Sequence, residues 1–343
     1  MAQIIRVGIA GGSGYTGAEL LRLCAGHRGL EVVWTSADRH AGDAVAELYP
    51  NLAGAYPDLV YSSFDPQEVD GLDMVFLALP HGAAQTLVAD LRKRVGHVVD
   101  LSGDFRLRDP TLYPTWYGAE HASPSLLAEF AFGLPELYRA DLVGAELVAA
   151  PGCYVTAAAL ALAPLVRAEA VEPSGVVVDA ASGISGAGRA PSPTTHFAAV
   201  DGGLSAYGLL THRHTPEIEQ ATGAQVLFTP HLAPMTRGIL ATCYARPAPG
   251  TAPSTADILG LLAGAYAGEA FVTVSPRPPS TKATLGSNCA HLTARVDPRT
   301  GWVLVICALD NLVKGASGQA LQCANLALGL PETAGLPTVG LYP

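Results

Sequence analysis

Short apolar runs alternate with amphipathic segments through the first half of the chain. Apolar runs predict strands at residues 4–10, 30–35, 74–79, 98–101 and 146–150. Helical periodicity predicts helices at residues 18–27 and 83–94. A chain that alternates strand and helix forms a parallel sheet with right-handed crossovers. We therefore expect an α/β domain of the Rossmann type.

The pattern changes after residue 152. Ala and Leu dominate residues 156–167, which indicates a buried helix, and later period-2 runs predict an α+β domain with a largely antiparallel mixed sheet. The predicted strands span residues 175–181, 225–230, 238–245, 271–274, 289–296 and 302–308, and the predicted helices span residues 212–220, 255–267 and 317–328. Residues 182–189 form a predicted glycine-serine loop, and residues 195–211 show no sustained period. We expect a dinucleotide-binding domain at 1–152, completed by a C-terminal helical segment at 311–343, and a catalytic and oligomerisation domain at 153–310.

A glycine-rich turn follows the first predicted strand. Residues 11–17 read Gly-Gly-Ser-Gly-Tyr-Thr-Gly, and a GxGxxG spacing starting at Gly12 and a GxxGxxG spacing starting at Gly11 both fit a dinucleotide fingerprint. Glycines let the backbone approach a pyrophosphate at the N-terminus of the next helix. A plain tight turn is the alternative, but the strand before it and the helix after it favour a cofactor site. The candidate residues are Gly11, Ser13, Gly14, Tyr15, Thr16 and Gly17.

The end of the second predicted strand bears on which dinucleotide is bound. It lies about 20 residues past the glycines, where Rossmann domains contact the adenosine ribose. Asp38 would favour NAD, whereas Ser36 and Arg39 would favour the 2′-phosphate of NADP. We predict NADP(H), and an ordinary surface charge is the alternative for Arg39.

The third predicted strand also ends at the sheet edge where such folds bind ligands. Leu79, Pro80 and His81 follow it and are candidate cofactor residues. His81 could equally cap the helix that follows. Ser102, Asp104 and Arg106 lie in a turn after the next strand, at the same edge.

Composition narrows the class of protein. Apolar residues make up 49% of the 343 and charged residues 15%, which indicates a core-rich globular chain. No apolar run reaches the ~18 residues of a membrane span, and the N-terminus lacks a signal-peptide layout, so we predict a cytoplasmic protein with no membrane partner. A net charge of −10 without a basic cluster predicts no nucleic-acid partner. Six cysteines without CxxC spacing predict free thiols and no metal site.

Cys153 is the candidate nucleophile. It follows Pro151 and Gly152 at the start of a predicted helix, where the helix dipole lowers the pKa of a thiol. A buried structural cysteine is the alternative. The predicted dinucleotide site favours the nucleophile, because a thiolate can attack an acyl carbon, expel a leaving group and hold a thioester for hydride transfer.

That chemistry also needs a proton-transfer group and cations. His212 and His214 are the candidates for proton transfer, and Glu217 could orient either imidazole. A polar helix cap is the alternative for the two histidines. The cations available for anionic substrate groups are Arg106, Arg189, Arg213 and Arg237, of which we select the first three, and a surface salt bridge is the alternative for each.

Seven motifs, in order and spacing, resemble the N-acetyl-gamma-glutamyl-phosphate reductases, which are relatives of aspartate-semialdehyde dehydrogenase. They span residues 11–20, 77–82, 100–107, 151–156, 182–189, 212–220 and 310–318. The resemblance implies NADPH-dependent reduction of N-acetyl-gamma-glutamyl phosphate to the semialdehyde in arginine biosynthesis, through a thioester on Cys153 with His212 as acid and base. It also implies a homodimer or homotetramer. Finally, it implies that Ser182, Gly183, Gly186 and Asn311 lie near the nicotinamide.

The sequence departs from the family pattern at two positions. Gly12 stands where Ala is common, and Val155 stands where Pro is common, which would loosen the first turn after the cysteine. Tyr154 favours the arginine-type substrate over the carrier-bound aminoadipyl phosphate of a sister branch in lysine biosynthesis. Aspartyl phosphate is a further alternative substrate. An alternative of another class is a non-catalytic dinucleotide-binding sensor.

Overall fold

The computed structural model describes residues 4–343, which divide into two compact units. Unit 1 contains Met1–Pro151 and Ala316–Leu336, and unit 2 contains Gly152–Gly315 and Pro337–Pro343. The units differ from the expected domains in the C-terminal part. Residues 311–315 and 337–343 belong to unit 2, and only the stretch between them belongs to unit 1.

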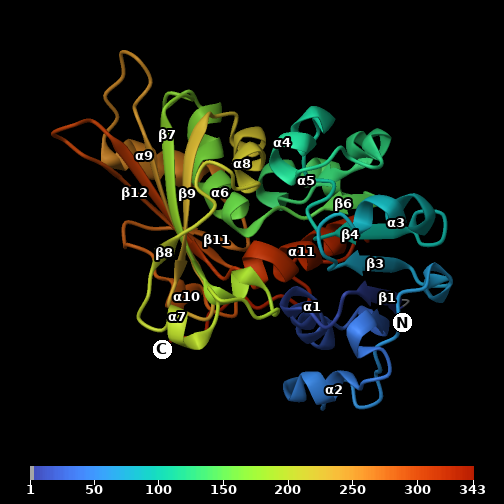
Figure 1. Cartoon of the computed structure of the whole chain (residues 1–343). Coiled ribbons are helices and arrows are strands. Elements are labelled where there is room, and N and C mark those ends of the chain that lie inside the picture. The colour runs from blue at the N-terminus through green and yellow to red at the C-terminus, as the bar shows by residue number, and fades with distance from the viewer. Residues whose placement is uncertain (1–3) are drawn as a thin grey trace. The chain divides into compact units, whose positions relative to one another are not determined.

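Unit 1 contains a six-stranded parallel sheet in the order β2-β1-β3-β4-β6-β5. Its strands are β1 (Ile5–Ala10), β2 (Leu30–Ser36), β3 (Met74–Leu77), β4 (His97–Asp100), β5 (Ala131–Phe132) and β6 (Leu147–Ala149). Its helices are α1 (Tyr15–Ala25), α2 (Val45–Leu48), α3 (Ala84–Leu91), α4 (Tyr113–Tyr117), α5 (Pro135–Leu142) and α11 (Gly318–Ala327), drawn in Figure 1. All four residues of β3 are buried, as expected for a central strand covered on both faces. The predicted Rossmann-type sheet is confirmed.

Helix α11 reaches unit 1 from the far end of the chain. Nine of its ten residues are buried, among them Gln319 and Asn325. The Gln319 side chain donates to the Gly133 carbonyl at 2.8 Å, and Asn325 pairs with the His27 ring at 3.1 Å. These hydrogen bonds offset part of the cost of burying the two side-chain amides.

Unit 2 contains a seven-stranded mixed sheet in the order β11-β12-β13-β10-β7-β9-β8. Its strands are β7 (Val176–Gly183), β8 (Ser205–Ala206), β9 (Val226–Ala233), β10 (Ile239–Ala245), β11 (Val272–Val274), β12 (Ala290–Val296) and β13 (Val303–Leu309). Its helices are α6 (Cys153–Arg167), α7 (Phe197–Val200), α8 (His214–Thr222), α9 (Thr255–Ala265) and α10 (Thr281–Thr284). Four of the six strand pairings are antiparallel, so the largely antiparallel mixed sheet is confirmed.

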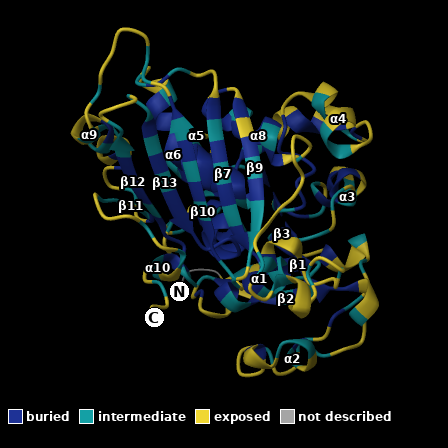
Figure 2. Cartoon of the chain, turned by 60° about the vertical axis from the view of Figure 1, so that its left-hand side comes forward, coloured by how far each residue is buried: buried dark blue, intermediate teal, exposed yellow. Residues whose placement is uncertain are grey.

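The two faces of this sheet differ in burial. Along β10 and β7, buried residues alternate with intermediate ones, which the banded strands of Figure 2 display. The buried face packs under α6, whose apolar residues are buried on every side. The intermediate face includes Val177, Leu240 and Leu304.

The predicted elements occur with shifts of a few residues, and three regions differ. Helix α6 begins at Cys153 rather than at residue 156. The predicted loop at 182–189 begins as the end of β7, and the irregular region 195–211 contains the short α7 and β8. Helices α2, α4 and α5 and strand β5 had no predicted counterpart, because each spans eight residues or fewer and shows no clear period.

Candidate active site

The glycine turn of unit 1 has the geometry of a phosphate cradle. Gly11 has a φ of +87°, in the left-handed region, and the backbone N–H groups of Gly11 and Gly12 donate to the Ser36 carbonyl at 3.0 and 2.9 Å. A β-carbon at Gly17 would lie 2.7 Å from the Gly12 Cα, so only glycine lets α1 approach the turn this closely. A β-carbon at Gly14 would meet nothing closer than 3.6 Å. That open side is where a pyrophosphate would approach.

Helix α1 begins directly after this turn. Gly14 is its N-cap, and no side chain caps the helix. The first N–H groups of a helix attract anions, so the residues here fit the pyrophosphate of a dinucleotide. The structure thus brings Gly11, Ser13, Gly14, Tyr15, Thr16 and Gly17 together in one turn and helix start.

Two tyrosines that sequence reasoning missed support this turn from the segment after β2. The Tyr49 hydroxyl donates to the Ser13 carbonyl at 2.8 Å, and the Tyr61 hydroxyl donates to the Gly12 carbonyl at 3.5 Å. Tyr61 is fully buried. The contacts join residues 36 and 49 positions apart, so no local pattern could have predicted them.

The acidic and basic residues after β2 lie in different environments. Asp38 Oδ1 accepts a hydrogen bond from the Phe64 N–H at 3.2 Å, which commits this carboxylate to the backbone. Arg39 is exposed. Ser36 is buried, and its carbonyl holds the glycine turn. Asp38 and Arg39 are both exposed, and Arg39 supplies a guanidinium suited to the 2′-phosphate of NADP.

His81 forms an ion pair with a buried aspartate. Its Nδ1 lies 2.5 Å from Asp104 Oδ1, and its ring lies 4.5 Å from the Tyr117 ring, centroid to centroid. Asp104 also accepts from the N–H groups of Gly82 and Ala84, at 2.8 and 3.0 Å. Burial raises the pKa of Asp104, but the hydrogen bonds from His81 and Gly82 outweigh it, so the pKa lies below its ordinary value. It is therefore Asp104, and not His81, that caps the start of α3.

Arg106 is buried in the turn after β4. Its Nε donates to the Ala150 carbonyl at 2.7 Å, and one terminal nitrogen donates to the Leu101 carbonyl at 3.0 Å. These bonds fix two loops of unit 1. A role for Arg106 in substrate binding stays a prediction.

Cys153 is the first residue of α6 in unit 2, and Gly152 is its N-cap. Of the six cysteines, all within the described residues, Cys153 alone is not buried. Burial raises the pKa of the thiols of Cys24 and Cys307 to about 12. The structure therefore singles out one accessible thiol, at a helix N-terminus where a thiolate is favoured.

Glu217 reaches this helix start from α8. The residue is fully buried, and its Oε1 accepts the Gly152 N–H at 2.8 Å. A carboxylate at a helix N-terminus is stabilised by the N–H groups exposed there. Glu217 thereby ties α8 to the residue that precedes the cysteine.

His214 lies against the same glycine. A β-carbon at Gly152 would fall on the His214 ring, at 2.7 Å from its Cδ2. The absence of a side chain at Gly152 therefore lets the buried imidazole lie next to the backbone that precedes Cys153. Gly152, Cys153, His214 and Glu217 form one cluster in unit 2.

His212 lies in an aromatic cage next to that cluster. Its ring centroid lies 5.8 Å from Tyr154, 5.5 Å from Tyr207 and 5.3 Å from Phe228. Its Nδ1 accepts the His214 N–H at 3.1 Å, which leaves the ring proton of the neutral imidazole on Nε2. Burial, followed by the charge of Arg213, lowers the pKa of His212 to about 4. His212 is therefore neutral at pH 7.

Sequence reasoning used Tyr154 only to choose between substrates, and it did not identify Tyr207. The Tyr207 hydroxyl donates to the Tyr154 hydroxyl at 3.1 Å, and the Tyr154 hydroxyl donates to the His231 carbonyl at 2.9 Å. Burial raises the pKa of Tyr207 to about 12 and that of Tyr154 further. Both hydroxyls are therefore neutral hydrogen-bond donors.

The loop after β7 is held by Asn311. The Asn311 amide donates to Ser185 Oγ at 3.0 Å, and its Oδ1 accepts the Gly238 N–H at 2.7 Å. A β-carbon at Gly186 would lie 3.7 Å from the same amide nitrogen. The structure thus brings Ser182, Gly183, Gly186 and Asn311 together in unit 2, although more than 120 residues separate Asn311 from the other three.

The arginines of unit 2 differ in exposure. Arg189 and Arg213 are exposed, while Arg237 is half-buried and lies 3.8 Å from Asp310. The charge of Arg213 acts on the cluster by lowering the pKa of His212. Arg189 and Arg213 as ligands of the substrate stay predictions.

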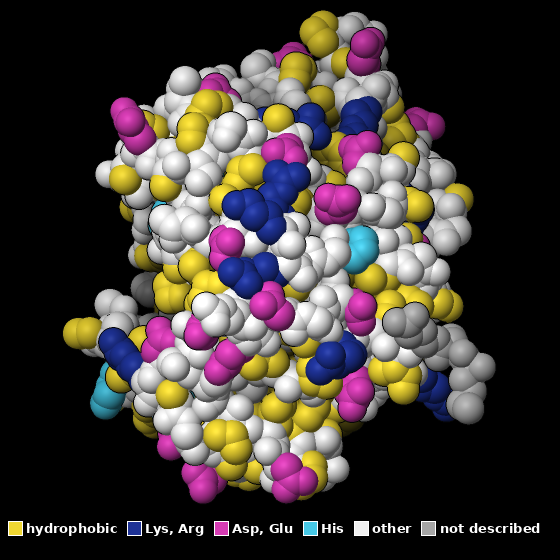
Figure 3. Space-filling model, turned by 90° about the vertical axis from the view of Figure 1, so that its right-hand side faces the viewer, with side chains coloured by type: hydrophobic (Ala, Val, Ile, Leu, Met, Phe, Trp, Pro, Cys, Tyr) yellow, Lys and Arg dark blue, Asp and Glu magenta, His cyan; other side chains and the backbone are white. Residues whose placement is uncertain are grey.

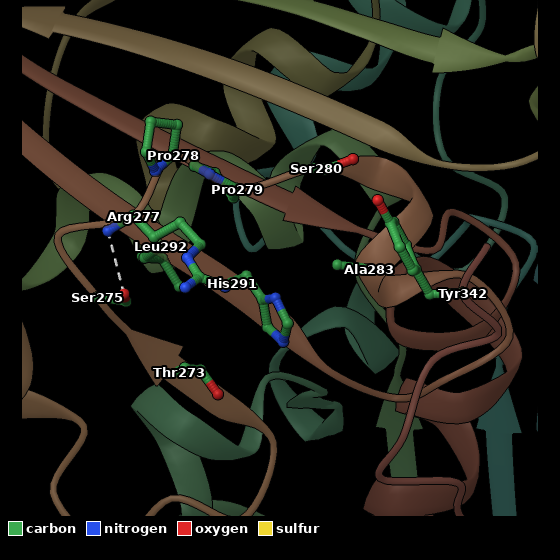
Figure 4. A pocket seen from close by; sticks show the side chains of 10 residues that line it. All are labelled: Thr273, Ser275, Arg277, Pro278, Pro279, Ser280, Ala283, His291, Leu292 and Tyr342. Atoms are coloured by element: carbon green, nitrogen blue, oxygen red, sulfur yellow. Dashed lines mark hydrogen bonds between the residues drawn. The ribbon is translucent and has the colours of Figure 1, made fainter.

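Other features bear on partners. A cavity of about 530 Å³ in unit 2, lined by Arg277, His291, Tyr342 and neighbouring residues, contains none of the predicted site residues (Figure 4). On the face drawn in Figure 3, Lys and Arg side chains are interspersed with Asp and Glu. Among the described residues there is no helix long and apolar enough to span a membrane. Residues 4–343 also contain no group of three or more His, Cys, Asp or Glu residues placed to hold a metal ion.

Comparisons with known proteins cover nearly the whole chain. Residues 6–145 match the family model for the semialdehyde dehydrogenase NAD binding domain, and residues 153–311 match that for the semialdehyde dehydrogenase dimerisation domain. The N-acetyl-gamma-glutamyl-phosphate reductase of Symbiobacterium thermophilum is 49% identical, over 99% of each chain. That of Desulforudis audaxviator is 47% identical, over 99% of this chain and 100% of the relative.

Solved structures with the same fold are more distant in sequence. Aspartate semialdehyde dehydrogenase II from Vibrio cholerae, in complex with ASA, aligns with a TM-score of 0.71 at 14% identity, over 96% of this chain and 99% of that one. The Candida albicans enzyme with NADP aligns with a TM-score of 0.66 at 15% identity, over 94% and 98%. At this identity the likeness supports the fold alone.

Proposed function

Because the chain belongs to the N-acetyl-gamma-glutamyl-phosphate reductase family, we propose that it catalyses the NADPH-dependent reduction of N-acetyl-gamma-glutamyl phosphate to N-acetyl-glutamate semialdehyde and phosphate. This reaction belongs to arginine biosynthesis, and we place it in the cytoplasm. The observation that carries the proposal is the single accessible thiol of Cys153 at a helix N-terminus, in one cluster with His214 and Glu217. Tyr154 after the cysteine favours this substrate over the carrier-bound aminoadipyl phosphate.

The thiolate of Cys153 attacks the acyl carbon, phosphate leaves, and a thioester forms on the sulfur. The accessible thiol and the N-terminus of α6 support this role. NADPH, when bound, supplies the hydride that reduces the thioester. The resulting thiohemiacetal on Cys153 then collapses to the semialdehyde and releases the sulfur.

His214 is the proton-transfer group that the geometry favours. Its ring lies against Gly152, whereas His212 lies in the aromatic cage beside it. His214 would take the thiol proton during attack and return it when the product leaves. Glu217 would hold the helix start against α8, and neutral His212 would orient the segment through its bond to the His214 N–H.

NADP(H) would be held by unit 1 through the glycine turn and the residues after β2 and β3. Gly11, Gly14 and Gly17 shape the turn, and the N-terminus of α1 would face the pyrophosphate. Arg39 would bind the 2′-phosphate. Leu79, Pro80 and His81 would complete the site, and in unit 2 the loop held by Asn311 would face the nicotinamide.

The substrate is a small anionic acyl phosphate, which needs cations. Arg189 and Arg213 are exposed arginines of unit 2 and could bind its phosphate and carboxylate. Arg106, which holds the Ala150 and Leu101 carbonyls, is the third arginine that we assign to the substrate.

A homodimer built on the half-exposed face of the seven-stranded sheet fits the match to a dimerisation domain. Apolar side chains of β7, β10 and β13 lie on this face, and a hollow of about 470 Å³ lies among Val177, Tyr244, Trp302 and Leu304. A monomer would leave this surface open to water, which costs free energy that a second copy recovers. A homotetramer would pair two such dimers.

The reverse reaction tests the function. The purified chain is incubated with N-acetyl-glutamate semialdehyde, phosphate and NADP, and the appearance of NADPH is followed by its absorbance. Carrier-bound aminoadipate semialdehyde and aspartate semialdehyde serve as comparison substrates, and NAD replaces NADP in parallel. Preference for another semialdehyde would refute the substrate, and no turnover on any would favour the sensor.

Replacing the nucleophile tests the mechanism. Cys153→Ser should bind NADPH with unchanged affinity and lose about 1,000-fold or more of turnover, because a hydroxyl is a far weaker nucleophile at neutral pH. His214→Asn should lose more activity than His212→Asn. A Cys153→Ser variant with a near wild-type rate would rule out the thioester.

A further inference from the structure

Cys153 meets a second glycine that lies far from it in the sequence. Gly315 follows β13 by six residues, and a β-carbon built on it would lie 2.8 Å from the Cys153 Cβ and 3.3 Å from the Cys153 Cα. Real β-carbons do not approach that closely, and neither contacting atom is the flexible end of a side chain. Any residue but glycine at 315 would therefore push the backbone that carries the thiol.

The position of Gly315 is set by a short π-helical turn at Val313–Ser317. The Gly315 N–H donates to the Asp310 carbonyl, five residues before it, at 2.9 Å. Such single-turn π-helices are rare, and they often mark functional sites. The tighter bond of an α-helix would place a different residue against Cys153.

Buried polar contacts at Asp310 hold the turn in this form. The Asp310 carboxylate is fully buried and accepts the N–H groups of Leu312 at 2.8 Å, Val313 at 3.2 Å and Gly286 at 2.7 Å. Arg237 lies 3.8 Å away and compensates its charge. The turn is therefore fixed from a segment outside itself, and not only by its own backbone.

Asn311 follows Asp310 and lies two residues before the turn. Asn311 holds both Ser185 and Gly238, as described above. One six-residue segment, residues 310–315, thus makes both contacts. Gly315 packs against Cys153, and Asn311 anchors the loop after β7.

We propose that Gly315 is a positioning residue for Cys153. The π-helical turn packs Gly315, which has no side chain, against Cys153 and thereby fixes the position of the Cys153 β-carbon. The proposal rests on the proposed function for the identity of the nucleophile. A displacement of about 1 Å at a reacting group costs about 100-fold in rate. The three atoms nearest a β-carbon built on Gly315 belong to Cys153 and Asp310, and none belongs to the glycine turn or to the loop held by Asn311 that we assign to NADPH. We therefore expect the effect to fall on the chemical step.

Gly315→Ala tests the proposal, and Gly260→Ala is its matched control. Gly260 lies in α9 of the same unit, and a β-carbon there meets no atom within 4 Å. For Gly315→Ala we expect kcat to fall about 100-fold, with KM for the acyl phosphate and Kd for NADPH within threefold of wild type. Gly260→Ala should keep wild-type values for all three.

Alkylation of the thiol separates positioning from loss of fold. Iodoacetamide should label Cys153 in the native protein, because the other five cysteines are buried. The pH profile of the labelling rate should shift in Gly315→Ala and stay unchanged in Gly260→Ala, with the labelled site read by mass spectrometry. A folded Gly315→Ala with kcat within threefold of the control and an unshifted profile would overturn the proposal.

A second variant decides the matter if Gly315→Ala does not fold. Asp310→Asn keeps the side-chain volume but weakens the acceptor of three N–H groups, so it loosens the turn without adding an atom near Cys153. We expect kcat to fall about tenfold, with the same shift in the labelling profile. Wild-type kcat in a folded Asp310→Asn would count against the proposal. Turnover retained by Cys153→Ser would instead refute the proposed function.

Discussion

Asp38 and Arg39 are neighbours in the sequence, but they do different work in the structure. The Asp38 carboxylate holds the Phe64 N–H, and Arg39 faces solvent. From the sequence alone this pair was ambiguous between NAD and NADP. In the structure one Asp38 oxygen accepts a backbone N–H and Arg39 supplies an exposed guanidinium, so Arg39 is the residue that we assign to the 2′-phosphate of NADP.

Arg39→Ala should weaken NADPH binding about tenfold or more, since hydrogen bonds between charged groups contribute about 1.5–3 kcal/mol. Binding of NADH should change less than twofold, because it lacks the 2′-phosphate. Fluorescence titration of both cofactors measures this. Arg28→Ala is the control, since Arg28 is also exposed but lies before β2, at the opposite edge of the sheet. An equal loss for both cofactors would contradict the assignment.

His212 makes the stability of the fold depend on pH. Its pKa is lowered to about 4 from an ordinary value of 6.5, so its contribution to stability is present above pH 6.5 and is lost as the pH falls towards 4. The difference corresponds to about 3 kcal/mol at most. We therefore expect the free energy of unfolding in urea to fall less between pH 6.5 and pH 4 for His212→Gln than for the wild type.

His196→Gln provides the comparison, because His196 is exposed. Its unfolding midpoint should follow that of the wild type across the same range. If the free energy of unfolding fell equally with pH in His212→Gln and in wild type, the neutral imidazole of His212 would be excluded as the cause of the pH dependence.

At the scale of elements, the segment between β2 and β3 forms hydrogen bonds to the glycine turn and to helix α1. Tyr49 and Tyr56 belong to it, and both hydroxyls donate to main-chain carbonyls. Tyr49 bonds to Ser13 in the turn at 2.8 Å, and Tyr56 bonds to Leu21 inside α1 at 2.9 Å. The two residues therefore form a natural pair for comparison.

Tyr49→Phe should raise the Kd for NADPH about fivefold, because the loss of about 1 kcal/mol falls on the turn that the cofactor contacts. Tyr56→Phe removes the same kind of bond from a helix interior and should leave the Kd unchanged. Titration of NADPH against both variants, with thermal unfolding as a check on stability, measures the difference. Equal Kd values for the two variants would dismiss a role for Tyr49 in shaping the turn.

The long elements and the chemical motifs could be predicted from the sequence. The central strands are continuous apolar runs, and the glycine turn stands in its expected strand-turn-helix setting. Cys153, His214 and Glu217 were predicted as site residues because a thiol at a helix start, with imidazole and carboxylate groups elsewhere in the chain, suits thioester chemistry. Short elements such as α4 and β8 were missed, since a few residues show no period.

What could not be predicted depends on contacts between distant residues. Gly315 and Cys153 lie 162 positions apart, and Tyr49 meets a carbonyl 36 positions away. A glycine or a tyrosine is common enough that its type alone suggests nothing. The sequence left His212 and His214 as alternatives for the same reason, because it could not show which ring lies against Gly152.

At the scale of the whole molecule, the open face of the seven-stranded sheet is the feature that bears on assembly. Leu304 stands in its middle, on β13, with Tyr244 of β10 opposite it. Both are only partly buried. A charge placed here would have to be desolvated in any assembly that covers the face.

Leu304→Glu should convert the assembly to a monomer, with the mass in light scattering falling to the 35.3 kDa of one chain. Val143→Glu is the control, because Val143 is an apolar residue of unit 1 that is 63% exposed. That variant should keep the wild-type mass. An unchanged mass for Leu304→Glu would place the interface on another surface.

The construction of unit 1 from two stretches has a consequence for synthesis on the ribosome. Residues up to 151 emerge first, but α11, with nine of its ten residues buried in this unit, emerges only after all of unit 2. At a synthesis rate of about 5–20 residues per second, roughly ten seconds or more pass between the emergence of the sheet of unit 1 and that of α11. During that interval its apolar surface is open to chaperones, and a nascent chain stalled before residue 318 should remain bound to them.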